Sequence, residues 1–460
     1  MRAWTVRRLI CPLHERLLGR RTLRNLRELE RSQWLSPDDL RALQRAKLAA
    51  LLGHAAVNTA FYRERLAQAA ADLGDGDPFE VLDRIPPIEK SDIRTHLESL
   101  LWREAPGGLF PQSTGGSTGE PLTIYLDRRR QGYDQAARLR SQGWFGARLG
   151  DAQLYLWGSP IELRSTDRIR AVRDRLFNHL LLDAFNMSPR RLDAYLDAWD
   201  RFRPVSVYGY PSSLALFAQH ARGRRRALDT SRLRAVFVTG EVCYPHDREA
   251  IGSYFGVPVA DGYGSRDAGF IAHECPEGGS HITAENVIVE ILRNGRRQPP
   301  GEAGEIVVTH LDAYGLPLIR YGTGDIGRLR AGRCACGRGL PLMDVVQGRS
   351  TDFLYLPDGT VKHALSIIYP LREMSAVRRF RVTQSEDLAV TVEVVCERGI
   401  DGTSQEAVAR RVRGVLGGDV PLRVRLVDEV TVAPSGKFRY VTSAASPGAA
   451  VAKEARPTYV

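Results

Sequence analysis

A short stretch rich in glycine and hydroxyl side chains, Ser113–Pro121, constrains this chain more than any other segment. Glycine permits a tight turn and lets main-chain N–H groups come close to an anion. Hydroxyl groups add further hydrogen-bond donors to the same space. The glycines are Gly115, Gly116 and Gly119, and the hydroxyl residues are Ser113, Thr114, Ser117 and Thr118. A loop of this composition is suited to holding phosphate oxygens.

The residues that follow the stretch argue against two other kinds of loop. A Walker-type phosphate loop needs a lysine after the second glycine of its pattern, whereas Glu120 and Pro121 follow Gly119 here. A hydrolase nucleophile elbow needs a helix after its G-x-S-x-G, whereas the β-branched and aromatic run Leu122–Leu126 predicts a strand. We therefore expect a lysine-free phosphate loop between two strands, with its cation supplied from elsewhere in the chain.

Composition places the chain among ordinary soluble globular proteins. Its 460 residues are enough for more than one domain, and 43% hydrophobic and 26% charged content is typical of that class. We find no apolar run of membrane-spanning length and no apolar core of a secretory signal, so we expect no transmembrane segment. Six cysteines without such a signal indicate a reducing compartment, and we expect a cytoplasmic protein.

The formal net charge of +11 indicates an anionic partner. We expect no nucleic-acid partner, because no basic stripe interleaved with aromatic residues and no nucleic-acid motif occurs. A nucleotide, a coenzyme or a membrane surface would account for the charge equally well. The arginine runs 128–130 and 224–226 are expected to be solvated. Lysine is rare, which draws attention to the few that occur: Lys47, Lys90, Lys362, Lys437 and Lys453.

The N-terminal segment predicts a basic amphipathic helix. Its apolar residues are expected on one helix face, and they are Val6, Leu9, Ile10, Leu13 and Leu17. We favour packing of that face on the body of the protein, and weak peripheral contact with an anionic membrane surface is the alternative. The sequence also leaves a homodimer open.

The middle of the chain alternates strands with helices, which predicts a parallel sheet. The expected strands are Val205–Tyr208, Ala235–Val238 and Val257–Ala260, and the expected helices are Leu214–Ala221 and Asp247–Phe255. Glycines gather where these strands end, and ligands bind at the carboxyl ends of strands in such sheets.

From His281 onward the pattern changes to long alternating strands, Ile282–Leu292 and Gly304–His310. We expect turns from Gly322 to Gly348, and a small α+β unit beyond Arg349.

Several motifs, taken in order, resemble those of the adenylate-forming superfamily, and most of all its phenylacetate-CoA ligase-like branch with its capsular-polysaccharide-biosynthesis relatives. The resemblance extends from about Leu40 to about Thr442. Ser113–Pro121 resembles the family's phosphate loop, Gly240-Glu241 its adenine-contacting turn, and Tyr263-Gly264-Ser265 its second nucleotide turn. Tyr321–Asp325 resembles the ribose-binding segment, Gly348–Asp352 the hinge, and Pro434–Arg439 the segment of the catalytic lysine.

The resemblance implies an α/β fold with a large N-terminal domain at 1–348, a small α+β lid at 349–445 that rotates about Asp352, and a flexible tail at 446–460. It implies ATP-dependent activation of a carboxylic acid to an acyl-adenylate with pyrophosphate release, then transfer to CoA. One alternative is transfer to an amine or hydroxyl acceptor in polysaccharide or secondary-metabolite biosynthesis. Another is a nucleotide-binding scaffold without catalysis.

The same resemblance assigns roles to single residues. Asp325 would accept hydrogen bonds from the ribose hydroxyls, and Arg349 would reach ribose or phosphate. Lys437 would lie between the carboxylate and the α-phosphate during adenylation. The superfamily usually has a magnesium-binding glutamate after the second nucleotide turn. Asp267 stands there in this chain, so Mg²⁺ is expected at a shorter carboxylate.

The acid cannot be identified from the sequence. The acid pocket is expected near the ends of two strands, at Tyr208, Tyr210, Pro211, Ala260 and Gly262. Aromatic walls would suit an aryl or flat acid, although core packing explains the tyrosines almost as well.

Four residues in turn-rich sequence form a candidate structural zinc site, namely Cys275, His281, Cys334 and Cys336. Thiolate and imidazole ligands suit tetrahedral zinc, and His273 is a competing fourth ligand. The alternative is a set of free thiols in loops, because the spacing is not that of a standard zinc finger.

Overall fold

The computed structural model describes residues 2–70, 76–114, 122–158, 167–347, 353–372, 374, 376–396, 402–417, 420–430 and 440–445. Residues 115–121 of the expected phosphate loop Ser113–Pro121, the expected hinge at 348–352 and Lys437 lie outside these residues. For Ser113 and Thr114, only the backbone of strand β1 is described.

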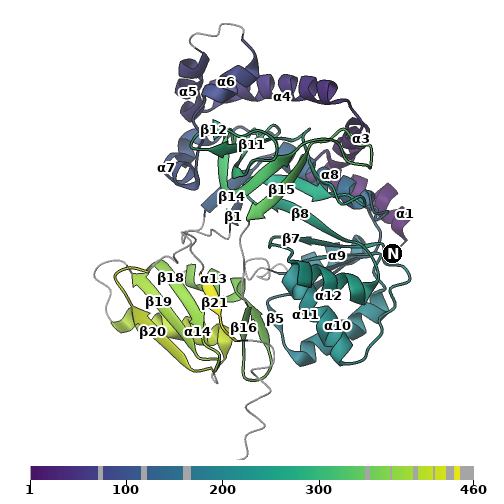
Figure 1. The fold of residues 1–460 in the computed structure, drawn as a ribbon, viewed down its shortest axis with the longest axis vertical. Helices are drawn as coiled ribbons and strands as arrows, with labels where there is room; N and C mark the ends of the chain where they lie inside the picture. The colour runs from purple at the N-terminus through teal and green to yellow at the C-terminus, as the bar shows by residue number, and fades with distance from the viewer. Residues whose placement is uncertain are drawn as a thin grey trace, which may run out of the picture.

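A 12-stranded sheet dominates the described part of the chain (Figure 1). Its strands, from edge to edge, are β12 (Arg296–Arg297), β11 (Val287–Arg293), β13 (Gly304–His310), β14 (Tyr321–Arg330), β15 (Leu342–Gln347), β10 (Ser280–Ile282), β9 (Gly269–Glu274), β8 (Val259–Ser265), β7 (Ala235–Thr239), β6 (Ser206–Gly209), β3 (Gln153–Trp157) and β4 (His179–Asp183). The strands β8, β7, β6, β3 and β4 run parallel, and the other neighbours in the sheet are antiparallel. The predicted α/β class with a parallel sheet is therefore confirmed.

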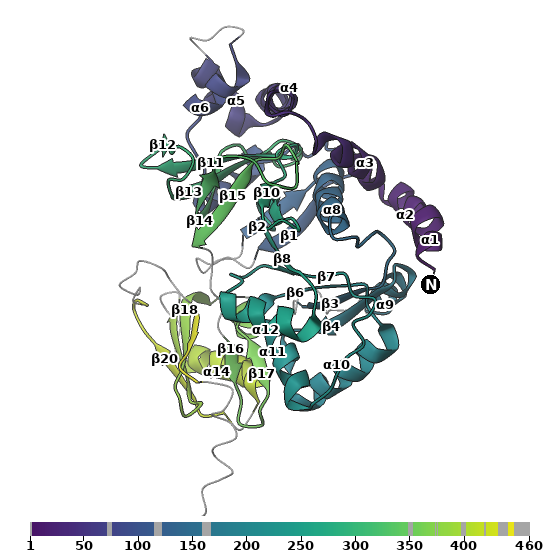
Figure 2. The same cartoon turned by 45° about the vertical axis from the view of Figure 1, so that its right-hand side comes forward.

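Helices cover both faces of the parallel strands (Figures 1 and 2). On one face lie α10 (Pro189–Phe202), α11 (Pro211–Gly223) and α12 (Pro245–Phe255), with α9 (Asp167–Leu176) beside β4. On the other face lies α8 (Arg128–Gly143). Apolar side chains of β7 point to both faces of the sheet, so both faces need cover. Val236 and Val238 pack with the first set of helices, whereas Phe237 packs with Phe145 on the opposite face.

The antiparallel half corrects two sequence-based expectations. The expected strand Ile282–Leu292 is two strands, β10 and β11, because Asn286 bonds back to Thr283 in a turn between them. The expected turns from Gly322 to Gly348 contain two strands, β14 and β15. Glycine is needed inside β14, because a side chain at Gly327 would lie 2.7 Å from Ile306 and 2.8 Å from the Asp344 carbonyl.

The N-terminal residues form a row of helices. They are α1 (Ala3–Thr5), a π-helical turn at Val6–Ile10, α2 (Cys11–Leu18), α3 (Thr22–Ser32), α4 (Pro37–Asn58), α5 (Ala60–Ala70), α6 (Pro78–Arg84) and α7 (Lys90–Leu100). Helices α4 to α7 share one core with the antiparallel strands. No helix in the described residues is both long and apolar enough to cross a membrane.

The expected packing face of the first helices is wrong. Val6 is fully buried, but Leu9, Leu13 and Leu17 are 57%, 60% and 76% exposed. The π-helical turn, in which Cys11 N–H bonds to the Val6 carbonyl, changes the register that an α-helical period assumes.

The C-terminal described residues have a separate core. Their strands are β16 (Phe353–Tyr355), β17 (Val361–His363), β18 (Val377–Gln384), β19 (Val390–Cys396), β20 (Leu422–Leu426) and β21 (Val441–Ser443), with helices α13 (Leu365–Arg372) and α14 (Gly402–Leu416). The last four strands form a sheet in the order β20-β19-β18-β21, and β17 pairs with β5 (Asn186–Met187) beside α10. An antiparallel pair of β1 (Phe110–Thr114) and β2 (Leu122–Leu126) flanks the expected phosphate loop, so strands stand on both sides of it as predicted.

Candidate active site and metal centre

The expected adenine turn lies at the carboxyl end of β7. Gly240 has a φ of +82°, a conformation that favours glycine, and a side chain there would come within 3.1 Å of the Tyr210 ring. Glu241 follows it and accepts a hydrogen bond from the Ser212 hydroxyl. The neighbouring Thr239 hydroxyl donates to the Gly262 carbonyl at 2.5 Å, which joins the end of β7 to the middle of β8.

Tyr263 and Asp325 meet although they are far apart in the sequence. The Tyr263 hydroxyl donates to Asp325 Oδ2 at 3.0 Å, and it lies 3.4 Å from the Thr323 hydroxyl. The Thr323 hydroxyl donates in turn to the Ile306 carbonyl and accepts from the Asp325 backbone N–H. Two of the expected nucleotide segments therefore adjoin, and the buried Asp325 carboxylate accepts a hydrogen bond from Tyr263.

Gly264 and Ser265 belong to β8 rather than to a turn after it, because β8 continues and pairs with β9 there. A side chain at Gly264 would lie 2.5 Å from the Gly269 carbonyl on β9, so only glycine fits at this position of β8. The Ser265 hydroxyl accepts the Ala268 N–H and thereby closes the turn to Asp267.

Asp267, the expected magnesium carboxylate, is buried between charged and polar partners. The Tyr321 hydroxyl donates to its Oδ2 at 2.6 Å, and Lys90 Nζ lies 3.6 Å from the same oxygen. The backbone N–H of the next residue, Ala268, donates to Asp267 Oδ1 at 3.1 Å. A carboxylate held in this way keeps a fixed orientation.

Sequence reasoning missed two cations beside Asp267. Arg130 was expected on a solvated face, but its side chain is buried and donates to the Asp267 and Arg266 carbonyls at 2.5 and 3.1 Å. Lys90 begins α7 in the N-terminal row of helices. The rarity of lysine drew attention to Lys90, but no sequence pattern indicated that it lies beside Asp267.

The expected pocket residues divide between two clusters. Tyr208 and Ala260 lie with Phe145 and Phe237 on one sheet face, and the Arg138 guanidinium lies 5.4 Å from the Tyr208 ring centre. Burial raises the pKa of Tyr208. Gly262, also on β8, is buried, and a side chain there would lie 2.9 Å from the His273 ring.

The second cluster of pocket residues lies at the start of α11. Tyr210 is buried and stacks on Trp157 with ring centres 4.1 Å apart, and Pro211 is the first residue of the helix. Flat aromatic faces therefore gather close to Gly240 at the carboxyl ends of β3, β6 and β7.

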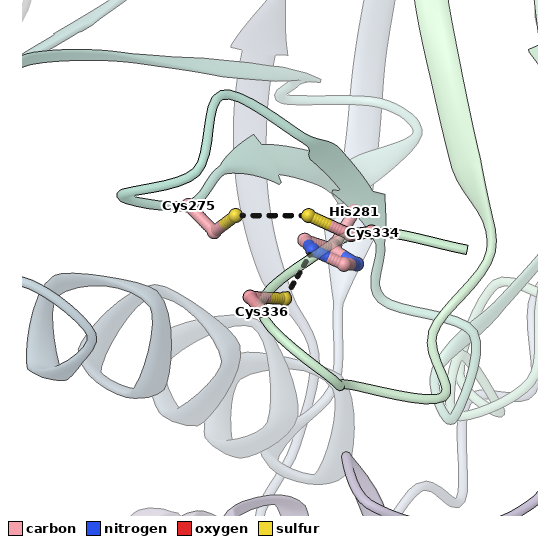
Figure 3. Close-up of side chains that lie close together, drawn as sticks. All are labelled: Cys275, His281, Cys334 and Cys336. Atoms are coloured by element: carbon pink, nitrogen blue, oxygen red, sulfur yellow. Dashed lines mark hydrogen bonds between the residues drawn. The ribbon is translucent and has the colours of Figure 1, made fainter.

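The structure brings together the four candidate zinc ligands, and His273 is not among them (Figure 3). Cys275 follows β9, His281 lies in β10, and Cys334 and Cys336 lie in the loop between β14 and β15. Their ligand atoms all lie within 4.8 Å of one another. The two Sγ atoms of Cys275 and Cys334 are 3.5 Å apart, and Cys336 Sγ lies 3.2 Å from His281 Nε2.

The surroundings of this cluster suit a metal. His281 Nδ1 lies 3.2 Å from the Leu340 carbonyl, so a proton on Nδ1 leaves Nε2 facing the sulfurs as a ligand. Burial lowers the pKa of His281 to about 4, so its ring is neutral at physiological pH. Burial raises the pKa of the Cys275 thiol to about 12, so this thiol needs a neighbouring cation in order to ionise. A side chain at Gly279 would lie 2.7 Å from Cys334 Sγ.

His273 faces elsewhere. Its Nδ1 lies 2.7 Å from the Glu274 carbonyl, and its ring packs among Phe237, Phe270 and Phe145. Four expected features remain outside the described residues and are not assigned a position: the phosphate loop at 115–121, Arg349, Asp352 and Lys437.

Comparison with known proteins defines the class of fold. No family model matches the chain. A solved structure of a 2-hydroxyisobutyryl-CoA ligase, in complex with 2-HIB-AMP and CoA in the thioesterification state, superposes with a TM-score of 0.60, covers 92% of this chain and 93% of its own, and is 20% identical. The same enzyme in the postadenylation state, in complex with 2-HIB-AMP, gives a TM-score of 0.53 at 20% identity, with 88% and 89% covered. The chain therefore has the fold of an adenylate-forming CoA ligase.

Sequence comparison finds similarity to enzymes of one kind. A phenylacetate-coenzyme A ligase of Thermus thermophilus is 26% identical over 337 residues, which are 70% of this chain and 73% of the relative. A phenylacetate-coenzyme A ligase of Pseudomonas putida is 25% identical over 391 residues, 80% of this chain and 85% of the relative. The chain is therefore similar in sequence to phenylacetate-coenzyme A ligases, in agreement with the resemblance of its motifs.

Proposed function

We propose that this protein is an acid–thiol ligase that activates a carboxylic acid with ATP. In the first half-reaction a carboxylate oxygen attacks the α-phosphorus of ATP, forming an acyl-adenylate and releasing pyrophosphate. In the second, the sulfur of CoA attacks the acyl carbon, forming a thioester and releasing AMP. The similarity to phenylacetate-CoA ligases along most of the chain supports both halves.

The contact of Tyr263 with Asp325 is the structural observation that carries this proposal. It joins two segments, 62 residues apart, which were assigned to the nucleotide on independent motifs. A carboxylate can accept hydrogen bonds from both hydroxyls of a ribose. Asp325 contacts Tyr263 on β8, which is the neighbour of β7, the strand that ends before Gly240-Glu241. In this proposal, Gly240 and Glu241 form the wall of the adenine site.

Asp267 and Lys90 take the phosphate end of the nucleotide in this proposal. Mg²⁺ prefers carboxylate and phosphate oxygens, and Asp267 is the carboxylate that the sequence motif offers. Lys90, whose Nζ lies 3.6 Å from Asp267, adds a positive charge for the departing pyrophosphate. Lys437 and the loop at 115–121 retain their predicted roles on the strength of sequence alone.

The test is a screen for pyrophosphate release over a panel of carboxylic acids that begins with phenylacetate, with and without CoA. Release that requires an acid but not CoA is the expected result. A thioester should form when CoA is added. If an amine or hydroxyl acceptor, rather than CoA, discharges the adenylate, the transfer step of the proposal is wrong. Absence of release with every acid of the panel would contradict the proposal and favour a nucleotide-binding scaffold without catalysis.

We also propose that Cys275, His281, Cys334 and Cys336 hold a structural Zn²⁺. Three sulfur ligands and one imidazole suit a closed tetrahedral zinc site without an open position for catalysis. The supporting observation is the convergence of the four ligand atoms from β10 and two loops. A metal there would join the turn after β9 to the loop between β14 and β15.

Metal analysis of the purified protein tests the zinc proposal. We expect about one equivalent of zinc in the wild type, and much less in a Cys336→Ser variant. Cys396→Ser is the matched control, because Cys396 lies on β19 outside the cluster. A wild type with less than about half an equivalent of zinc, unchanged by Cys336→Ser, would contradict the proposal.

A further inference from the structure

Four large apolar side chains at the N-terminus are exposed. Trp4, Leu9, Leu13 and Leu17 are 63%, 57%, 60% and 76% exposed. They follow one another at intervals of five, four and four residues. The interval of five spans the π-helical turn, whose hydrogen bonds join residues five apart, so all four side chains lie along one side of the helix. We call these four residues the N-terminal apolar stripe.

The opposite side of the same helix is already used for packing. Val6 and Cys11 are buried, and Val6 lies against the position of Gly150. Arg7 donates to the Leu149 carbonyl at 3.0 Å, and His14 packs edge-on against Phe177 with ring centres 5.0 Å apart. The helix is therefore fixed to the body through this side, and the stripe is a separate surface that faces outward.

Arginines surround the stripe. Residues 2–27 contain eight arginines and one acidic residue, Glu15, which is buried and paired with Arg20 at 3.0 Å. The exposed arginines among them are Arg2, Arg8, Arg16, Arg21, Arg24 and Arg27. Within the described part of the chain, Arg24 is the one member of this group that pairs with an acid, Glu28. An apolar row with arginines on both flanks is complementary to a surface with an apolar interior and anionic head groups.

Both views place α1 and α2 on the outer edge of the molecule, on the opposite side from the C-terminal strands β18, β19 and β20 (Figures 1 and 2). A planar surface can therefore contact the stripe without covering those strands.

We propose that the N-terminal apolar stripe binds the surface of an anionic lipid bilayer. The apolar side chains of the stripe enter the head-group region, with Trp4 at the interface, where tryptophan is favoured. The flanking arginines bind lipid phosphates. Binding is peripheral and reversible, since the helix lies flat on the surface and its inner side stays packed on the protein.

Cosedimentation with lipid vesicles tests the proposal on the full-length protein. The wild type should bind vesicles of equal parts phosphatidylcholine and phosphatidylglycerol, and should bind pure phosphatidylcholine much more weakly. Added salt should weaken binding, because it screens the arginine charges. The triple variant Leu9→Ser, Leu13→Ser, Leu17→Ser should lose on the order of tenfold or more in vesicle affinity.

The control for the stripe is Val57→Ser, since Val57 is 70% exposed on α4, away from the N-terminal helix. This variant should bind vesicles as the wild type does. Circular dichroism and thermal unfolding establish that each variant is folded. Because the leucines of the triple variant are exposed, it should melt close to the wild type.

A second pair of variants separates charge from apolar contact. Arg8→Gln with Arg16→Gln should reduce the preference for phosphatidylglycerol, whereas Arg410→Gln with Arg413→Gln on α14 should not. Equal binding to both vesicle types, or undiminished binding by the triple serine variant, would overturn the proposal. A third outcome would also overturn it: the wild type is a dimer that does not bind vesicles, and the triple serine variant is a monomer. The stripe would then be covered by a second copy of the chain.

Discussion

Individual side chains in the candidate active site are held by partners from distant parts of the chain. Tyr263 on β8 holds Asp325 on β14, and Tyr321 on β14 holds Asp267 in the turn after β8. Motif positions indicated Asp325 and Asp267, because their neighbours in sequence are characteristic. They could not indicate Lys90 or Arg130 as partners of Asp267, since contacts across the fold leave no local pattern.

Asp325→Asn should impair adenylation. The amide presents one acceptor oxygen and no charge, so charge-assisted hydrogen bonds to the ribose are lost. We expect kcat/KM for ATP, measured by pyrophosphate release, to fall by roughly 10- to 100-fold. Asp344→Asn on β15 is the matched control, because Asp344 forms a partly exposed ion pair with Arg328. Equal activity of the two variants would argue against Asp325 as a ribose ligand.

Asp261 on β8 should make stability depend on pH. Burial, the largest cause, and the neighbouring Glu274 carboxylate raise the pKa of Asp261 to about 7, although Arg248 opposes them. An unfolded aspartate ionises near pH ~4, so the folded state binds more protons between about pH 4 and 7. The stability that this proton contributes is fully present below about pH 4 and is lost as pH rises to about 7.

Asp261→Asn removes this dependence, because an amide has no proton to lose. Relative to the variant, the wild type should lose up to about 4 kcal/mol of unfolding free energy between about pH 4 and 7. Urea unfolding of both proteins at several pH values measures the difference. Stability curves that stay parallel across this range would show that Asp261 ionises normally in the folded protein.

At the scale of elements, the alternation of apolar strands with helices predicted the parallel half of the sheet well. In that half, Ser188 caps α10 by accepting the Arg191 N–H at 3.4 Å. The strand β14 was mistaken for turns because Gly322, Gly324 and Gly327 mimic turn composition. Its identity as a strand depends on pairing with β13 and β15, which lie elsewhere in the sequence.

For the N-terminal helix, too, the sequence pattern was insufficient to predict which side packs on the protein. A period of 3.6 residues places Val6 and Leu9 on one side, but the π-helical turn separates them. Nothing in the local composition marks such a turn. The candidate zinc ligands, by contrast, were identified from the sequence. Residue type alone indicated these four ligands, which form the cysteine cluster Cys275, His281, Cys334 and Cys336, and the structure brings them together.

Removal of metal from the cysteine cluster should destabilise the elements that it joins. We expect a strong chelator to lower the melting temperature of the wild type by about 5 °C or more, since metal-binding free energy contributes to folding. Added zinc should reverse the change. The Cys336→Ser variant should melt at the lower temperature with or without chelator. If the chelator lowers the melting temperatures of the wild type and of Cys336→Ser equally, its effect is unrelated to these four residues.

At the scale of the whole molecule, we propose that the chain divides at about residue 349 into a large unit and a small mobile lid. The separate core of the C-terminal strands supports this division. The order of motifs along the chain, together with the alternating strand and helix pattern, was sufficient to predict the class of fold. The relative orientation of the two units depends on contacts such as the pairing of β17 with β5, and no sequence pattern predicts this pairing.

Lys437→Ala should separate the two half-reactions if the lid carries Lys437 to the site for adenylation alone. Acyl-adenylate formation should fall on the order of a hundredfold or more, which is the scale of removing one preorganised charge. Thioester formation from a supplied acyl-adenylate and CoA should be retained. Lys453→Ala, the other lysine near the C-terminus, is the control. Adenylation by Lys437→Ala at close to the wild-type rate would contradict the role of Lys437.

The central claim is that the reaction proceeds through an acyl-adenylate. Acid-dependent exchange of labelled pyrophosphate into ATP, in the absence of CoA, tests it most directly, because exchange requires a reversible first step that is complete before the acceptor binds. We predict exchange with at least one acid of the panel, abolished when the acid is omitted and reduced by Asp325→Asn. Thioester formation with no exchange under any acid would contradict a separate adenylate intermediate.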